Sequence, residues 1–105
     1  MIWFEYDGKA FEPNSETEYG EPQLWLYLSD GTSIEITQEQ EGIPEVDYYF
    51  SVRHHCNDED FDNGIYHGTC GVIDEGYFDE LWCVQECLKI TLAALASAGV
   101  HLDLS

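Results

Sequence analysis

The amino-acid sequence predicts an α+β fold, in which a small antiparallel sheet of about four strands is covered by one long C-terminal helix. Two observations favour this fold. Short segments of the first half alternate between apolar and polar residues around a hairpin signal at 24–37, whereas residues 77–98 follow a helical period. Strands first and a helix last are typical of α+β domains. The 105 residues are expected to form one domain, 1–105, with one core.

The first strand is expected at the N-terminus, where residues 2–6 alternate in character before the turn signal Asp7-Gly8. Residues 12–23 contain two prolines, one glycine and four glutamates, which predicts a loop.

The hairpin at 24–37 has two conceivable registers. A two-residue turn at Asp30-Gly31 would place the aromatic residues of its first strand on the face of the isoleucines of its second. A three-residue loop, Ser29-Asp30-Gly31, with Gly31 in the left-handed conformation, would separate aliphatic from amphipathic side chains. Because a slip of one residue inverts every side chain, we predict this second register. Its expected pairs are Leu24 with Ile36, Trp25 with Glu35, Leu26 with Ile34 and Tyr27 with Ser33.

The next strand is expected at 46–53, which shows the clearest alternation in the chain. Its apolar positions are Val46, Tyr48, Phe50 and Val52. The acidic segments 38–45 and 54–64 are expected to be connectors. Residues 65–73 are apolar but contain Gly68 and Gly71, so they predict at best an irregular strand.

The helix is expected at about 77–98 and would be roughly 30 Å long. Asp74 or Asp79 is expected to cap its start, and Gly99 to end it. Its predicted apolar stripe consists of Phe78, Leu81, Gln85, Leu88, Leu92 and Leu95, widened by Trp82, Val84, Thr91 and Ala94.

Charge is the most unusual property of the sequence. Twenty-two Asp and Glu residues face only Lys9, Arg53 and Lys89, which gives a formal charge of −19 at pH 7. Small domains reach solubility with a net charge of about 2–8, and a larger charge destabilises the compact state by self-repulsion. The surplus indicates attraction for a basic macromolecule. It argues against nucleic acid and anionic membranes as direct ligands, because both are bound through Lys and Arg.

Cysteine usage and the N-terminus indicate the compartment. The N-terminus lacks the basic and apolar regions of a secretory signal, and the weakly polar stretch 90–100 is too short to span a bilayer. The four cysteines (56, 70, 83 and 87) are therefore expected to be reduced thiols, and the protein to be cytoplasmic.

Metal-binding patterns are incomplete. The candidate zinc ligands are His54, His55, Cys56, His67, Cys70, Cys83 and Cys87. They contain no CxxC pair, and His67-x-x-Cys70 has no matching second half. The acidic segment from Asp58 resembles a calcium loop but has Asn63 where glycine is required and Thr69 in place of the twelfth-position glutamate. We expect no metal site and no cofactor.

Catalytic signatures are also missing from the sequence. Cys56 lies beside His54 and His55, and Cys70 near His67, but adjacency in sequence does not create a thiolate–imidazole pair. The glycines do not form a phosphate-binding loop. We therefore expect a protein that is not an enzyme and has no catalytic residues.

A partner-binding surface is the remaining candidate site. Aromatic residues on the polar sides of the strands would anchor a partner, while the surrounding acids would attract a basic one. The alternative is that a loop or the helix covers the aromatics and that the acids are simply solvated. The predicted partner-binding residues are Trp25, Tyr27, Glu35, Glu39, Glu41, Glu45, Asp47, Tyr49, Asp58, Asp60 and Asp62.

In size, acidity and lack of an enzymatic signature, the whole chain resembles the bacterial immunity proteins that neutralise nuclease toxins, including those of contact-dependent growth inhibition. The resemblance is one of type and assigns no role to any single residue. It implies a cytoplasmic inhibitor that binds a cognate toxin over its basic active site.

Two other functions fit the composition. A nucleic-acid mimic of the phage anti-restriction or anti-CRISPR type would present carboxylates in ordered rows to a DNA-binding protein, but the predicted helix carries few acids and the acidic connectors are irregular. A small metal-binding regulator would need bound zinc. The oligomeric state does not follow from the sequence.

Overall fold

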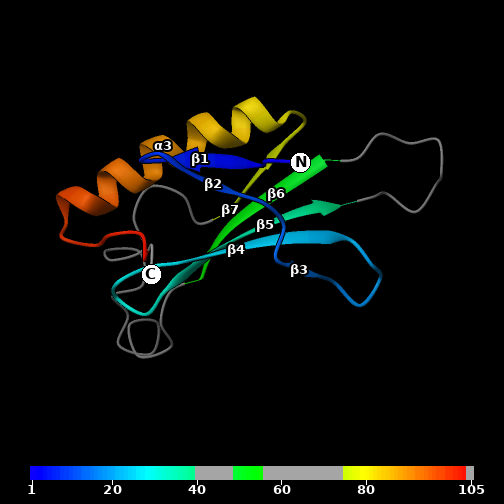
Figure 1. Ribbon diagram of the computed structural model, residues 1–105, viewed down its shortest axis with the longest axis horizontal. Helices are drawn as coiled ribbons and strands as arrows, with labels where there is room; N and C mark the ends of the chain where they lie inside the picture. Colours follow the sequence, from blue (N-terminus) through cyan, green and yellow to red (C-terminus); the bar gives the residue numbers. More distant parts are fainter. Residues whose placement is uncertain (40–48, 56–74, 104–105) are drawn as a thin grey trace.

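The computed structural model describes residues 1–39, 49–55 and 75–103 and has the predicted α+β architecture (Figure 1). One antiparallel sheet has five strands in the order β3-β4-β5-β6-β7, and a second has two, β1 and β2. The elements are β1 (Phe4–Tyr6), β2 (Lys9–Phe11), β3 (Ser15–Glu16), β4 (Pro22–Tyr27), β5 (Ser33–Glu39), β6 (Tyr49–His55), β7 (Glu75–Phe78) and the 17-residue helix α3 (Leu81–Ser97).

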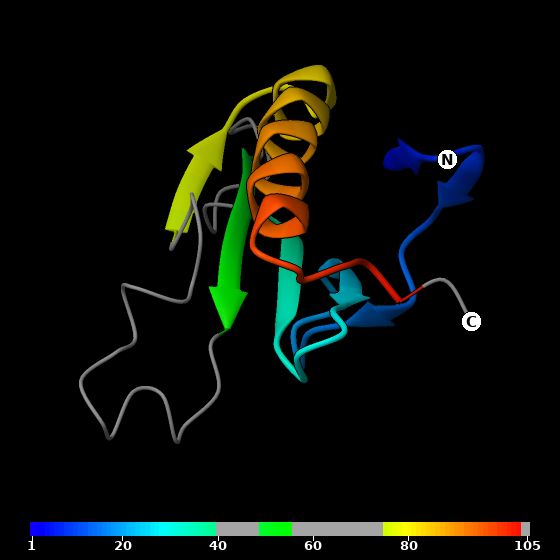
Figure 2. The ribbon, with the colours of Figure 1, turned by 90° about the vertical axis from the view of Figure 1, so that its left-hand side faces the viewer.

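The core lies between α3 and one face of the five-stranded sheet. Figures 1 and 2 show α3 and the β1–β2 hairpin on this same side. The hairpin is attached through Trp3, whose ring meets that of Phe50 edge to face with the centroids 5.4 Å apart, and through the Glu5 amide, which donates to Gln85 Oε1 at 3.3 Å. The buried apolar residues are Trp3, Phe4, Leu24, Leu26, Leu28, Ile34, Ile36, Phe50, Val52, Val84, Leu88, Leu92 and Leu95.

The β4–β5 hairpin confirms the predicted register. Leu24 pairs with Ile36, Leu26 with Ile34, Trp25 with Glu35 and Tyr27 with Ser33. Gly31 has a φ of 88°, which supplies the left-handed residue of the loop. The loop is closed by the amides of Leu28 and Gly31, which donate to the carbonyls of Thr32 and Leu28, and by Asp30 Oδ1, which accepts from the Thr32 amide at 3.0 Å.

The N-terminal strand and its turn are confirmed, and the predicted loop at 12–23 is wrong at 15–16, which form β3, and at 22–23, where β4 begins. Asp7 and Gly8 both have positive φ, as two-residue hairpin turns require. They return the chain into β2, a strand that the sequence analysis did not expect. Beyond it, β3 pairs with the start of β4, so that Ser15 lies opposite Gln23 and Glu16 opposite Pro22.

In β6, the predicted burial of Phe50 and Val52 is confirmed at 3% and 0% exposed, although Ser51 between them is also buried, at 4%. The connector predicted from residue 54 is wrong at its start, because β6 continues to His55. The His54 side chain is 1% exposed, and its Nε2 lies 3.0 Å from Thr32 Oγ1, so this polar residue is accommodated in the core by a hydrogen bond. The predictions for 40–48 and 56–73 lie outside the described residues.

The helix begins later than predicted. Tyr77 and Phe78 belong to β7, where they pair with Ser51 and Phe50, so pairing in the sheet prevails over their helical spacing. The N-cap is Glu80 without a side-chain cap hydrogen bond, so the Asp79 cap is wrong, and Asp74 lies outside the described residues.

The predicted stripe of α3 is corrected at two residues, because Phe78 lies in β7 and Trp82 is exposed. Its buried members are Val84, Leu88, Thr91, Leu92 and Leu95. Trp82 is 68% exposed, because it lies two residues before Val84 and therefore on the other side of the helix.

The predicted end of the helix is confirmed. Gly99 has a φ of 86°, its amide donates to Ala96 O, and the Val100 amide donates to Leu95 O at 2.9 Å, which together form a Schellman motif. The chain then runs back along the end of β4. There, the Ser29 amide donates to the carbonyl of His101 and the Asp103 amide to the carbonyl of Tyr27, both at 2.8 Å.

Candidate functional site

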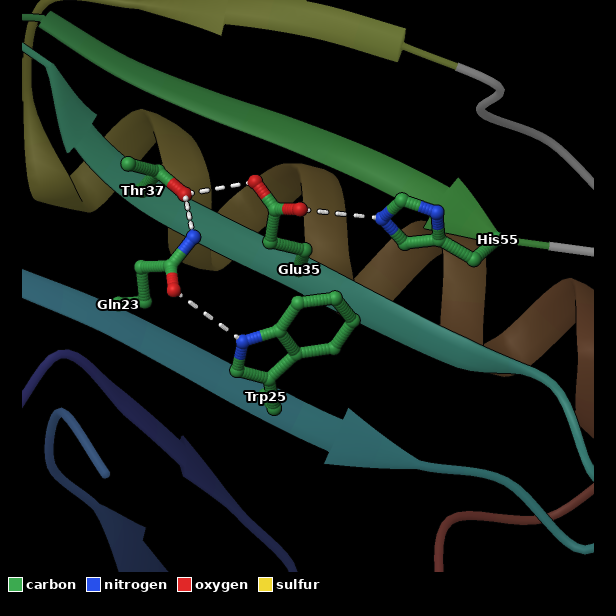
Figure 3. Close-up of polar contacts among 5 residues, drawn as sticks. All are labelled: Gln23, Trp25, Glu35, Thr37 and His55. Atoms are coloured by element: carbon green, nitrogen blue, oxygen red, sulfur yellow. Dashed lines mark hydrogen bonds and ion pairs between the residues drawn. The ribbon is translucent and has the colours of Figure 1, made fainter. Parts of the chain in front are cut away.

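The candidate site is the face of the five-stranded sheet that points away from α3, which we call the open face. Side chains alternate along a strand, so the residues between the buried apolar ones belong to this face. Two of them, Thr37 and Ser51, are themselves buried, with 2% and 4% of their surface exposed. Within the described ranges no helix or strand lies over it, and in Figure 3 α3 lies behind the sheet. Its described residues are Gln23, Trp25, Tyr27, Ser33, Glu35, Thr37, Glu39, Tyr49, Ser51, Arg53, His55 and Tyr77.

The strand pairing places these residues in rows across the sheet. Trp25 lies opposite Glu35, and Glu35 opposite Arg53. Tyr27 lies opposite Ser33, and Ser33 opposite His55. Directly opposite and diagonal neighbours on one face are within reach of long and aromatic side chains, so adjacent rows form one surface.

Glu35 is at the centre of a hydrogen-bonded network on this face (Figure 3). Its Oε1 lies 3.1 Å from His55 Nε2, and its Oε2 accepts from Thr37 Oγ1 at 2.7 Å. Thr37 Oγ1 in turn accepts from Gln23 Nε2 at 3.1 Å, and Trp25 Nε1 donates to Gln23 Oε1 at 3.5 Å. The Glu35 side chain is only 15% exposed, so these bonds fix its carboxylate in a partly desolvated position.

The rings of Trp25 and His55 close this network into a cluster. They are stacked, with centroids 5.2 Å apart and an interplanar angle of 27°. When His55 is protonated, its contact with Glu35 is also an ion pair. The cluster therefore presents an aromatic surface whose side chains are held by one another before any partner arrives.

The backbone of Trp25 is held from outside the sheet by Asn14. The Trp25 amide donates to Asn14 Oδ1, and Asn14 Nδ2 donates to the Trp25 carbonyl, both at 3.0 Å. The side-chain amide thus takes the place of a neighbouring strand at this point of the β4 edge, between β3 and the C-terminal residues.

Tyrosines extend the surface on both sides of the cluster. Tyr27 and Tyr77 are 59% and 61% exposed, and Tyr77 contacts Tyr49 edge to face at a centroid distance of 5.6 Å. Exposed aromatic side chains supply much contact area for little loss of conformational entropy, which suits them to anchor a partner.

Five predicted partner-binding residues lie on the open face: Trp25, Tyr27, Glu35, Glu39 and Tyr49. The strand pairing brings them together as two facing pairs, Trp25 with Glu35 and Glu39 with Tyr49, with Tyr27 one row further along β4. The remaining predicted residues, Glu41, Glu45, Asp47, Asp58, Asp60 and Asp62, lie outside the described residues.

Sequence reasoning missed seven residues of this face: Gln23, Ser33, Thr37, Ser51, Arg53, His55 and Tyr77. Continuing the alternation of the hairpin strands by one step would have found Gln23 and Thr37. His55 was missed because the polar sequence after residue 53 was interpreted as loop, and Tyr77 because its spacing also fitted the helix.

The described residues do not assemble a metal centre. Within 1–39, 49–55 and 75–103, no group of three or more His, Cys, Asp or Glu side chains is close enough to hold an ion. His54 and His55 lie on opposite faces of β6, so these neighbours in sequence do not form a ligand pair. Cys83 and Cys87 are free thiols on α3, and burial raises the pKa of the Cys87 thiol.

The comparisons with known proteins give no evidence about function, so the open face is the main evidence. No protein-family model, curated protein or solved structure matches the chain. Among the residues that the structure describes, no helix combines the length and the apolar character needed to cross a lipid bilayer.

Proposed function

We propose that the protein is a cytoplasmic inhibitor of the immunity type, which binds a basic protein, a nuclease toxin, and neutralises it through the open face. The observation that carries this proposal is the prearranged cluster of Trp25, Glu35 and His55, flanked by exposed tyrosines, in a chain of net charge −19.

The chemistry of the surface supports a protein partner. Aromatic anchors in the centre of an interface supply most of its binding energy, and charges around them accelerate association. A nuclease must carry Lys and Arg to hold phosphates, so its active site is itself a basic surface. A carboxylate-rich inhibitor complements that surface and excludes nucleic acid from it.

The arrangement of acids favours an inhibitor over a nucleic-acid mimic. Glu86 is the only acid of α3, and the central acid of the open face, Glu35, is engaged by His55 and Thr37. A mimic instead needs carboxylates in a regular row, spaced like the phosphates of a duplex.

The test begins with the tagged protein in an extract of its native host at low salt. The retained protein is identified, its nuclease activity is measured, and the titration of that activity by the inhibitor is followed. We expect stoichiometric inhibition and an association rate that falls by at least about tenfold between low and physiological salt. A partner with a neutral or acidic binding surface would contradict the proposal.

Variants locate the interface. Tyr27→Ala and Tyr77→Ala are each expected to raise the dissociation rate by about tenfold or more, because each removes an exposed anchor. Tyr19→Ala is the matched control, since Tyr19 is 83% exposed but lies between β3 and β4, away from the open face. Glu35→Gln retains the shape of the side chain but weakens its contacts with His55 and Thr37, so it should mainly raise the dissociation rate. Equal effects of Tyr27→Ala and Tyr19→Ala would refute the assignment to this face.

A further inference from the structure

His55 brings a group that can change its charge near neutral pH into the centre of the open face (Figure 3). Histidine is the side chain that ordinarily gains or loses a proton between pH 5 and 8. The His55 ring stacks on Trp25, and its Nε2 lies 3.1 Å from Glu35 Oε1. A change in its charge therefore takes place inside the cluster on which the proposed function depends.

The Glu35 carboxylate determines which ring nitrogen takes up the proton. An ionised carboxylate only accepts hydrogen bonds, and the other oxygen of Glu35 already accepts from Thr37 Oγ1. His55 Nε2 must therefore carry a hydrogen even when the ring is neutral, so the additional proton binds to Nδ1. The bond to Glu35 exists in both states. Protonation changes the charge of the pair, because positive His55 cancels the negative charge of Glu35.

The other ionisable groups near His55 belong to the neighbouring strands. Arg53 lies two residues earlier in β6, and the pairing places it opposite Glu35 in β5 and Glu75 in β7. Tyr27 of β4 lies in the same row as His55, and tyrosine hydroxyls are uncharged at these pH values. The group that His55 Nε2 contacts is Glu35, whose side chain is 15% exposed, so water screens this pair only in part.

We infer that His55 is a positioning residue, which holds Glu35 and Trp25 in place for the basic partner, and that protonation of His55 weakens the binding of that partner. The inference rests on the proposed function. With neutral His55, the partner meets a negative charge beside an aromatic anchor. With protonated His55, that charge is cancelled and the partner's cations are repelled. Binding and protonation are linked, so the partner must also favour loss of the His55 proton.

An NMR titration of the free protein between about pH 5.5 and about pH 7.5 tests the coupling within the cluster. The indole N–H resonance of Trp25 should shift with the same midpoint as the ring resonances of His55, because the two rings are stacked. Trp82 is the matched control. Its side chain is 68% exposed on α3, on the other side of the sheet, and its indole resonance should not follow His55.

The effect on binding is measured by calorimetry, with the basic protein retained from the host extract as the probe. Its dissociation constant should be about five- to tenfold larger near pH 5.5 than near pH 7.5. His55→Gln keeps a donor for Glu35 but cannot gain a proton, so it should lose this difference. His101→Gln is the control and should retain it, since His101 is exposed in the C-terminal segment. Groups that titrate on the probe affect all these proteins alike.

The outcomes separate the inference from the proposed function. A Trp25 resonance that does not follow His55, or a pH dependence of binding that persists in His55→Gln, would overturn the inference alone. The His55 side chain is 37% exposed, so this variant should fold, which circular dichroism verifies. Binding that is unchanged in Tyr27→Ala would refute the proposed function, and with it any role of His55 in recognising the partner.

Discussion

Asn14 shows how a single side chain can position a binding residue through the backbone. Its amide group bonds both the N–H and the C=O of Trp25, where a neighbouring strand would otherwise pair. Because these two backbone groups of Trp25 are already hydrogen-bonded to a side chain, another chain cannot pair with β4 at this point.

We expect Asn14→Ala to lower the free energy of unfolding by about 1–2 kcal/mol, because it removes two hydrogen bonds from a partly exposed strand edge. Urea denaturation followed by fluorescence measures the change. Ser15→Ala is the control, since Ser15 pairs in β3 through its backbone, which the substitution retains. Equal midpoints for Asn14→Ala and the unmodified protein would show that the amide does not hold β4.

Cys87 provides a test of burial at the residue scale. Burial raises the pKa of its thiol above 9.0, so near pH 8 less of it is thiolate in the folded than in the unfolded chain. Alkylation of Cys87 by iodoacetamide, followed by peptide mapping, should be several-fold slower in buffer than in urea. The folded thiol ionises at higher pH than the unfolded one, so this group favours folding at neutral pH and loses that contribution as pH rises through its folded pKa. Equal alkylation rates in the two states would contradict the assignment.

Single residues also mark where sequence reasoning succeeded and where it did not. The side of the sheet on which Trp25 lies followed from alternation, because a strand offers two faces and the aliphatic residues occupied the other. The side of α3 on which Trp82 lies did not follow, because a helix offers a continuous range of directions and a tryptophan at the edge of a stripe fits either assignment. Packing against β1, β6 and β7 decides which part of the stripe is buried, and that information is not local.

At the scale of elements, a segment is predicted well when its own sequence carries the pattern that defines it, and poorly when it is defined by pairing with another strand. The register of the β4–β5 hairpin was predicted to the residue, since its two strands adjoin one loop with a glycine that needs positive φ. Strands β3 and β7 have two and four residues, too few for a pattern, and they exist through pairing with β4 and β6. The start of α3 was misplaced for the same reason, because β7 takes residues whose spacing also suits a helix.

The end of α3 carries a prediction at this scale. Gly99→Ala should lower the free energy of unfolding by about 1–2 kcal/mol, because an L side chain disfavours the φ of 86° that the Schellman motif requires. Thermal denaturation by circular dichroism measures the loss. Gly99→Asn should lose less than Gly99→Ala, since asparagine tolerates the left-handed region better. The reverse order would mean that the cap does not need this conformation.

For the molecule as a whole, the net charge is the property that most affects stability. The sheet and helix bury one apolar core, while the net charge of −19 opposes compaction over the entire surface. The composition predicts this balance and a helix with few acids, but it does not indicate which side of α3 is exposed, because the exposed side of a helix depends on what the other side covers.

We expect the melting temperature to rise by several degrees between about 20 mM and about 500 mM salt, because screening reduces the self-repulsion of the folded chain more than that of the expanded one. Differential scanning fluorimetry in NaCl and in choline chloride separates general screening from specific binding of sodium, since both salts should act alike. A melting temperature that falls with salt would mean that net attraction between charges, and not repulsion, governs the folded state.

The bonds between residues 101–103 and the end of β4 have a consequence for contacts with other chains. Without residues 101–103, the Ser29 amide and the Tyr27 carbonyl would lose their backbone partners on the outer side of β4. A variant lacking these residues would retain every residue of the open face, yet it would also offer an unpaired strand end to any other extended peptide. Residues 101–103 thus protect this edge of the sheet from pairing with another chain.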